Sequence, residues 1–304
     1  SLEKMILTNK IMMVRPNTFR SNEETLKNNF FQKKFSKSEQ KNLKIKVLKE
    51  FDDLVYNLEK NNIDVSINQG SLIHENPDEI FSNNWIIFDE NKIGIFSMFA
   101  KNRRTEINND YVKSLSKNNY KFFDYSKYAL KNIFLEGTGS IVLDRENKKA
   151  YCCISQRSNK SLFLQFCKDF KYEPILFNAY QNVNGKKKSI YHTNVMMSIG
   201  PKICVICLDS IDNNFEKNSV INNLATNNKI LSISNKQMES FAANIIFLKS
   251  NTNVQIVISE TAINSLTNFQ INELENIGNI IKCEIPTIEK FGGGGVRCMI
   301  TEVF

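Results

Sequence analysis

The sequence predicts an α/β fold assembled from five ββαβ-like modules arranged around a common axis. One order of predicted elements recurs about every 50 residues, which is the signature of a modular architecture. The chain has 304 residues, of which 41% are hydrophobic and 24% are charged, so it can bury a large core. Five such units favour modules arranged around a common axis over one doubly wound open sheet.

The first module is predicted from three segments. An apolar run at 11–14 reads as a strand and is followed by Arg15 and Pro16. Residues 38–60 carry apolar side chains at helical spacing, and residues 63–67 alternate between apolar and polar side chains as a half-buried strand does. The predicted order of this module is therefore strand, helix, strand.

The other four modules each contain two apolar runs, a segment with helical periodicity and one more extended run. They share no recognisable sequence identity with one another. In each module the order is strand, strand, helix, strand. The second module is predicted at 85–88, 93–98, a helix from 107, and 120–124, and the third at 140–143, 150–154, 160–170 and 173–177. The fourth is predicted at 192–199, 203–208, 213–225 and 230–232, and the fifth at 245–249, 254–259, 261–277 and 280–285.

The chain ends in an unusual stretch that begins with Phe291 and four consecutive glycines, Gly292–Gly295. Glycines have large backbone freedom and no side chain to pack, so they predict a hinge or a loop that lies close to a ligand. Residues 296–304 are predicted as a short closing strand. Cys298 follows Arg297 there, and a neighbouring cation favours the thiolate form of a nucleophile. The alternative is a small buried hydrophobe behind a flexible linker.

Charge and cysteine content restrict the class of protein. The 40 Lys and Arg against 32 Asp and Glu give a formal charge of +8, but the lysines are scattered along the whole length. No nucleic-acid-binding signature accompanies them, so a solvated surface is the favoured interpretation. Seven cysteines without a signal peptide predict free thiols in a reducing, cytoplasmic compartment. No apolar run is long enough to span a membrane.

No metal or organic cofactor is predicted. Cys204 and Cys207 have the spacing of half a zinc site, but they lie inside the apolar run at 203–208. Side chains three positions apart on a strand point to opposite faces, which favours core packing over a shared metal.

Polar side chains at the ends of the predicted strands form the candidate site. The chain has only two histidines, and His192 stands at the start of a strand, whereas His74 lies in a polar loop and is expected to be exposed. A cysteine nucleophile, a histidine acid–base and a carboxylate that orients the imidazole form a hydrolytic set. If the loops of the modules converge at one mouth, Cys298 and His192 meet there.

Seven ordered motifs together resemble the pentein superfamily of guanidine-modifying enzymes. The similarity runs from Ile11 to Phe304, and it is most like the arginine-deiminase-related, amidinotransferase-like branch that includes the citrulline hydrolases. This resemblance implies a single catalytic domain over 1–304, folded as a five-bladed α/β propeller around a pseudo-fivefold axis. The motifs are Met13-Val-Arg-Pro16, Asn22-Glu-Glu-Thr25, Pro77-Asp-Glu-Ile-Phe-Ser-Asn-Asn-Trp85, Asn102-Arg-Arg104, Leu135-Glu-Gly-Thr-Gly-Ser140, Tyr191-His-Thr-Asn-Val195 and Gly292-Gly-Gly-Gly-Val-Arg-Cys298.

The resemblance also implies roles for individual residues. Cys298 would attack the planar carbon of a guanidine or urea group, His192 would shuttle protons, and Glu136 would hold the substrate or His192. Arg103 and Arg157 would clamp the α-carboxylate of an amino-acid substrate, a task that suits the bidentate guanidinium. A plain turn at Glu136 and ordinary surface positions for the two arginines remain the alternatives.

Two departures from the arginine-deiminase pattern bear on the substrate. Aspartates that bind the cationic guanidinium there are replaced here by Asn84 and Asn194. A buried cation needs carboxylate partners, whereas an asparagine amide both donates and accepts hydrogen bonds. The sequence therefore favours a neutral ureido substrate, most simply citrulline.

Three other readings stay open. Arginine or a methylarginine is the substrate if Glu136 and Asp78 supply the missing charge. Amidino transfer differs from hydrolysis only in the acceptor. A propeller that merely binds a small ligand is the non-enzymatic alternative. The sequence leaves the oligomeric state open, a homodimer included, as it does the question whether the loop at 179–189 closes over the site.

Overall fold

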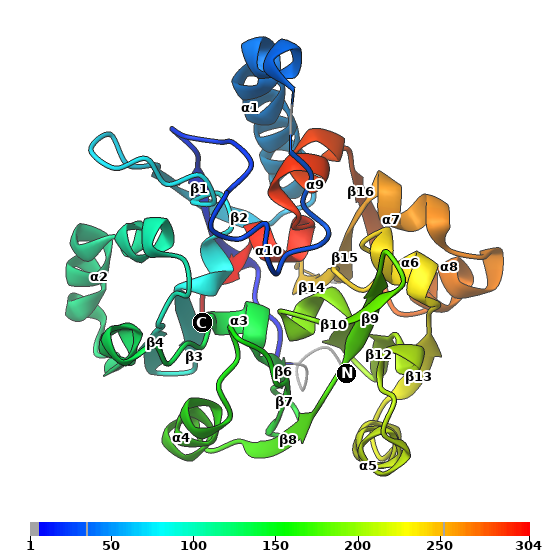
Figure 1. Cartoon of the computed structure of the whole chain (residues 1–304). Helices are drawn as coiled ribbons and strands as arrows, with labels where there is room; N and C mark the ends of the chain where they lie inside the picture. The colour runs from blue at the N-terminus through cyan, green and yellow to red at the C-terminus, as the bar shows by residue number, and fades with distance from the viewer. Residues whose placement is uncertain (1–5, 35, 252) are drawn as a thin grey trace.

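The computed structural model describes residues 6–34, 36–251 and 253–304. Within them the strands form five three-stranded sheets and one separate hairpin. In each three-stranded sheet the middle strand pairs antiparallel with one neighbour and parallel with the other. The five sheets surround the middle of the molecule, and the longer helices lie outside them (Figure 1). The predicted α/β class and the predicted modules are confirmed.

The sheets follow the chain, except that the last strand joins the first sheet. β17 pairs antiparallel with β1, with Ile11 opposite Glu302, so the two ends of the described chain complete one module. The strands, in sheet order, are β17 (Thr301–Glu302), β1 (Lys10–Arg15), β2 (Asp64–Gln69); β3 (Ile86–Asp89), β4 (Lys92–Ile95), β5 (Lys121–Asp124); β6 (Val142–Asp144), β7 (Lys149–Cys153), β8 (Glu173–Phe177); β11 (Met197–Gly200), β12 (Ile203–Ile206), β13 (Lys229–Ser232); and β14 (Ile246–Lys249), β15 (Val254–Ser259), β16 (Asn279–Cys283).

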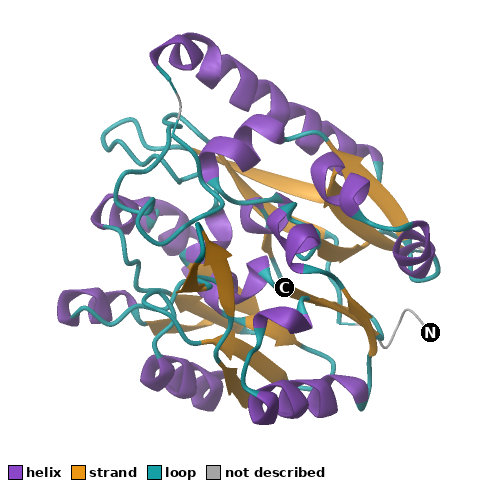
Figure 2. Cartoon of the chain, turned by 45° about the vertical axis from the view of Figure 1, so that its right-hand side comes forward, coloured by secondary structure: helices purple, strands orange, loops and turns teal. Residues whose placement is uncertain are grey.

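The longer helices lie at the periphery, as a view turned by 45° also shows (Figure 2), whereas the short helices α3 and α10 lie near the centre (Figure 1). None of those in the described part of the chain has the length and apolar character that a membrane crossing requires. They are α1 (Lys37–Lys60), α2 (Asn109–Leu115), α3 (Gly137–Ser140), α4 (Lys160–Phe170), α5 (Asn214–Ala225), α6 (Asn235–Glu239), α7 (Glu260–Ser265), α8 (Asn268–Glu275), α9 (Pro286–Gly292) and α10 (Val296–Met299), with the 3-10 helices η2 (Ser82–Asn84), η3 (Lys101–Glu106), η4 (Ser116–Asn118), η5 (Ser126–Lys131), η6 (Thr193–Val195) and η7 (Leu208–Ser210).

Helix α4 illustrates how the sequence specifies an outer helix. The Asn159 side chain caps its start by accepting from the backbone N–H of Leu162, and Lys171 ends it in the left-handed conformation with a φ of 63°. Its apolar side chains recur at helical spacing and are buried against the third sheet. The predicted bounds of this helix, 160–170, agree with the structure.

Three predicted elements differ from the structure. The strand expected at 296–304 is the short helix α10 followed by β17, and His192 precedes the turn η6 rather than opening a strand. The helix expected at 261–277 is divided into α7 and α8, because Thr267 forms a capping box with Gln270 and starts a new helix. In the first two cases the chain makes a helical turn to bring a polar side chain to the centre before it enters the sheet.

The loop at 179–189 forms the hairpin of β9 (Tyr180–Val183) and β10 (Lys186–Ser189). Every residue of β10 is exposed, and Lys187 forms an ion pair with Asp212. A different segment, residues 17–33, contacts the candidate site described below.

Gly137 lies where backbone segments approach each other most closely. Its φ is +48°, and a Cβ atom added there would be 2.2 Å from the backbone oxygen of Asn83. We expect Gly137→Ala to lower the free energy of unfolding by about 2 kcal/mol or more, from left-handed strain and from the steric clash. Urea denaturation measures this change.

Gly185 provides the matched control, because its φ is +77° and an added Cβ would meet nothing within 4 Å. Gly185→Ala should cost about 1 kcal/mol, the strain alone. Equal losses in the two variants would contradict the steric argument.

Candidate active site

The candidate site is built from helical turns. In each sheet, one such turn precedes the strand that pairs antiparallel with the middle strand. Four are regular turns: η2 before β3, α3 before β6, η6 before β11 and α10 before β17. The fifth is the turn closed by the hydrogen bond from Asn244 N–H to Phe241 O, before β14. Figure 1 shows α3 and α10 at the centre of the molecule. Polar side chains from consecutive modules are thereby brought together.

Glu136 and His192 form a buried, hydrogen-bonded pair in the site. His192 Nε2–H donates to Glu136 Oε1 at 2.7 Å, and the backbone N–H of Phe99 donates to Oε2 at 2.9 Å. Burial by itself raises the pKa of Glu136, but Arg157, His192 and Arg103 outweigh it and lower the pKa to about 2. Burial lowers the pKa of His192 to about 4. At neutral pH the carboxylate is therefore ionised, the imidazole is neutral, and Nδ1 is its basic nitrogen.

Cys298 is buried and receives hydrogen bonds from two side-chain amides. Asn194 Nδ2 donates to Sγ at 3.5 Å and Asn244 Nδ2 at 3.3 Å. Burial raises the pKa of the thiol, and these two amides act against that effect. Sequence reasoning missed Asn244. Its position two residues before β14, like that of Asn84 before β3, is the signal that the modular repeat offers.

Arg103 is buried and holds Asn84. It forms a bidentate ion pair with Glu106, through Nε at 2.8 Å and Nη2 at 3.0 Å, and its Nη1 donates to Asn84 Oδ1 at 2.7 Å. Nη2 also donates to the Phe81 carbonyl at 3.2 Å. Four of its five N–H groups thus have internal acceptors. The predicted carboxylate clamp remains a prediction, while the observed contacts position Asn84.

Arg157 joins the Glu136–His192 pair to the segment 17–33. Its Nε donates to Asn28 Oδ1 at 3.0 Å, and its Nη1 lies 3.5 Å from Glu136 Oε1. The guanidinium also stacks on Tyr191, 4.7 Å from the ring centroid. Arg157 is therefore positioned by both sides of the site.

The segment 17–33 makes further contacts around the site. Asn22 Nδ2 donates to Asp78 Oδ2 at 2.8 Å, and Asn29 Nδ2 donates to the Gly293 carbonyl at 3.3 Å. Asp78 is buried, its Oδ1 has no hydrogen-bond partner among the described residues, and burial raises its pKa. The segment thus contacts residues of several modules. The Oδ1 atom of Asp78 remains able to accept a hydrogen bond.

The glycine run at 292–295 lies in close contact with neighbouring side chains. A Cβ atom added at Gly292 would be 2.6 Å from the Phe81 ring, and one at Gly295 would be 2.6 Å from Asn244 Oδ1. Tyr191 donates its hydroxyl to the Gly293 carbonyl at 2.9 Å. Of the two predicted roles, hinge or close approach, the observed packing favours close approach.

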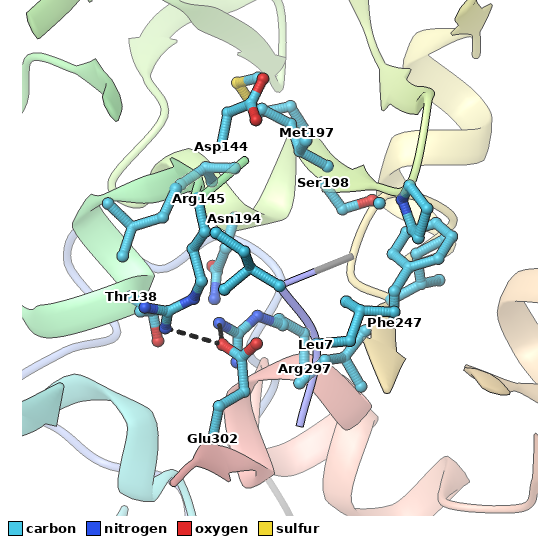
Figure 3. Close-up of a pocket in the computed structure, with 18 of the residues that line it drawn as sticks. Leu7, Thr138, Asp144, Arg145, Asn194, Met197, Ser198, Phe247, Arg297 and Glu302 are labelled. Carbon is cyan, nitrogen blue, oxygen red and sulfur yellow. Dashed lines mark hydrogen bonds and ion pairs between the residues drawn. The ribbon is translucent and has the colours of Figure 1, made fainter. Parts of the chain in front are cut away.

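A cavity of about 70 Å³ lies beside the site (Figure 3). Asn194 and Thr138 line it from the site side, and the ion-paired Arg145, Arg297 and Glu302 line it as well. Asn194 thus contacts both the cavity and Cys298. His74 is exposed, as predicted. The described residues contain no cluster of three or more ionisable metal ligands.

Residues 15–304 match the family model described as N,N dimethylarginine dimethylhydrolase, eukaryotic. The chain belongs to this family. Its membership confirms the resemblance to the pentein superfamily and makes the chain an enzyme that hydrolyses carbon–nitrogen bonds other than peptide bonds. No curated protein matches the sequence.

Solved structures similar to this dimethylhydrolase-family chain share its fold. A substrate-bound variant of the N-terminal domain of ArgZ, an arginine dihydrolase from Cyanobacteria, is 14% identical with a TM-score of 0.71, over 97% of each chain. AgrE with ornithine and NAD⁺ is 15% identical with a TM-score of 0.75, over 97% of this chain and 39% of AgrE. A dimethylarginine dimethylaminohydrolase adduct with S-methyl-L-thiocitrulline is 14% identical with a TM-score of 0.65, over 98% and 100%.

The depressed pKa of His192 predicts a specific loss of stability in acid. Unfolding restores its pKa from about 4 to its ordinary value of 6.5, so below pH 6.5 the unfolded chain binds a proton that the folded chain does not. Stability should fall by up to about 3 kcal/mol as the pH drops from 7 to 4. Urea denaturation at several pH values measures it.

The control is His192→Gln, which retains a hydrogen-bond donor for Glu136 but does not titrate. Its stability should depend less on pH between 6.5 and 4 than that of the unmodified protein. The same slope in both proteins would assign the acid sensitivity to other groups.

Proposed function

We propose that the protein is a cysteine-dependent hydrolase of a ureido amino acid, and that it converts citrulline to ornithine, ammonia and carbon dioxide. We also infer that the five sheets are the blades of one propeller and that the reaction takes place at its central mouth. The amide-lined surroundings of Cys298 carry the proposal. Both Asn194 and Asn244 donate to Sγ, and Asn84 accepts from Arg103.

Free polar atoms on these asparagines and on Asn83, whose Oδ1 accepts from Asn84 Nδ2 at 2.9 Å, match a neutral ureido group. Oδ1 of Asn194, Oδ1 of Asn244 and Nδ2 of Asn83 are buried without hydrogen-bond partners among the described residues. The ureido NH₂ has donors for the two oxygens, and its carbonyl has an acceptor for the Asn83 amide. The hydrogen bonds to Sγ come from amides, so a cationic guanidinium placed there would meet neutral groups, and an unpaired buried charge is costly.

The chemistry follows from the assigned groups. The Cys298 thiol gives its proton to Nδ1 of His192, Sγ forms a bond to the ureido carbon, and the bond from that carbon to the terminal nitrogen breaks. His192 passes the same proton to that nitrogen, which leaves as ammonia. Water then attacks the thiocarbamate carbon, aided by the basic Nδ1 of His192, and the Cys298 thiol is released. The resulting carbamate loses carbon dioxide to give ornithine. Glu136 orients the imidazole throughout, as its 2.7 Å contact allows.

A second candidate is arginine or a methylarginine, which the family description supports. In this case Glu136 and the free Oδ1 of Asp78 supply negative charge for the cation. The same thiol and imidazole would act on a guanidino carbon in place of a ureido carbon.

A product assay separates the two candidates. Purified protein is offered citrulline, arginine and dimethylarginine separately, and ammonia, ornithine and citrulline are quantified. We expect ornithine and ammonia from citrulline, and no product from the Cys298→Ala variant. Citrulline formed from arginine or dimethylarginine would establish the second candidate and overturn the ureido assignment.

Replacing the asparagines by aspartates should shift the preference towards arginine. Asn194→Asp should raise the arginine-to-citrulline ratio of kcat/KM by about 10-fold or more, because a carboxylate then faces the guanidinium. Asn84→Asp should have a smaller effect, since Arg103 already donates to this position and would neutralise the new charge. Asn235→Asp on α6, outside the site, is the control. An unchanged ratio in Asn194→Asp counts against the amide argument.

A further inference from the structure

Asn244 holds its side-chain amide in one defined orientation. The same Nδ2 atom lies 2.9 Å from the backbone carbonyl oxygen of Asn194 and 3.3 Å from Cys298 Sγ. A carbonyl only accepts, so the atom beside it must be the nitrogen, and a flipped amide would place two oxygens in contact. The thiol sulfur therefore faces an N–H group.

Arg297 and His192 make their hydrogen bonds to groups other than Cys298 Sγ. Arg297, its neighbour in the chain, donates to the Ile300 carbonyl and to Glu302 at 2.9 Å each. His192 donates to Glu136. A hydrogen bond to an ionised acceptor is much stronger than one to a neutral acceptor, so a fixed N–H donor favours the thiolate over the thiol.

Gly295 explains how this donor approaches so closely. Its φ of −100° suits any residue, so backbone strain does not require glycine here. An added Cβ would instead lie 2.6 Å from Asn244 Oδ1. The last glycine of the run leaves room for the Asn244 amide directly against the turn that carries Cys298.

We propose that Asn244 is a catalytic residue whose Nδ2–H stabilises the Cys298 thiolate. This assignment rests on the proposed function only through the nucleophilic role of Cys298, and it is independent of the substrate. The Asn244 amide is a neutral donor. A cation in its place would also stabilise the thiolate, but it would repel a guanidinium substrate. The backbone of the module that carries Asn194 sets the orientation of the amide.

The ionisation of Cys298 in substrate-free protein tests the proposal. The rate of alkylation by iodoacetamide is followed against pH by mass spectrometry of the peptide that contains Cys298. In Asn244→Ala we expect the midpoint to rise by about one to two pH units, so that alkylation below the midpoint slows by about 10- to 100-fold. Asn235→Ala removes an asparagine that accepts from the buried Cys207 outside the site, and should leave the midpoint unchanged.

Gly295→Ala is the second variant, because it displaces the amide without deleting it, and its midpoint should also rise. Thermal unfolding identifies which variants remain folded. If Asn244→Ala does not fold, Gly295→Ala decides the question. An unchanged midpoint in a folded variant reduces Asn244 to a packing role. A raised midpoint in a protein that does not convert citrulline would support Asn244 and overturn only the substrate assignment.

Discussion

The structure of the site depends on neutralising one fully buried carboxylate. Glu136 is 0% exposed, and an unpaired charge at such depth would cost several kcal/mol. His192 and the Phe99 backbone satisfy its two oxygens directly, and Arg157 adds positive charge. Each partner comes from a different part of the chain. These contacts around Glu136 fix the position of the imidazole. Arg157 also donates to Asn28, which connects Glu136 to the segment 17–33.

Close backbone approach is the second constraint on the centre. Several helical turns meet there, and side chains larger than hydrogen do not fit at some positions. Gly139 is one of them, because an added Cβ would lie 2.4 Å from Asn84 Nδ2 and 2.8 Å from His192 Nδ1. Glycines thus allow the polar groups of neighbouring modules to lie close together.

Polarity around Cys298 differs from that around His192. The imidazole lies beside a carboxylate and near two arginines, whereas the sulfur receives hydrogen bonds from neutral amides. Under the proposed function, the charged groups around His192 would serve proton transfer, and the amides around Cys298 would face the neutral ureido group. The chemistry proposed here uses both halves.

The sequence by itself determined the module order, most element bounds and the motifs that place the chain among the penteins, because apolar periodicity and local caps are read from neighbouring residues. Helix 160–170 is an example. Only the tertiary structure decided that Arg103 donates to Asn84 and that Asn244 contacts the sulfur of Cys298. These features depend on contacts between segments far apart in the chain, and local propensity carries no information about such contacts.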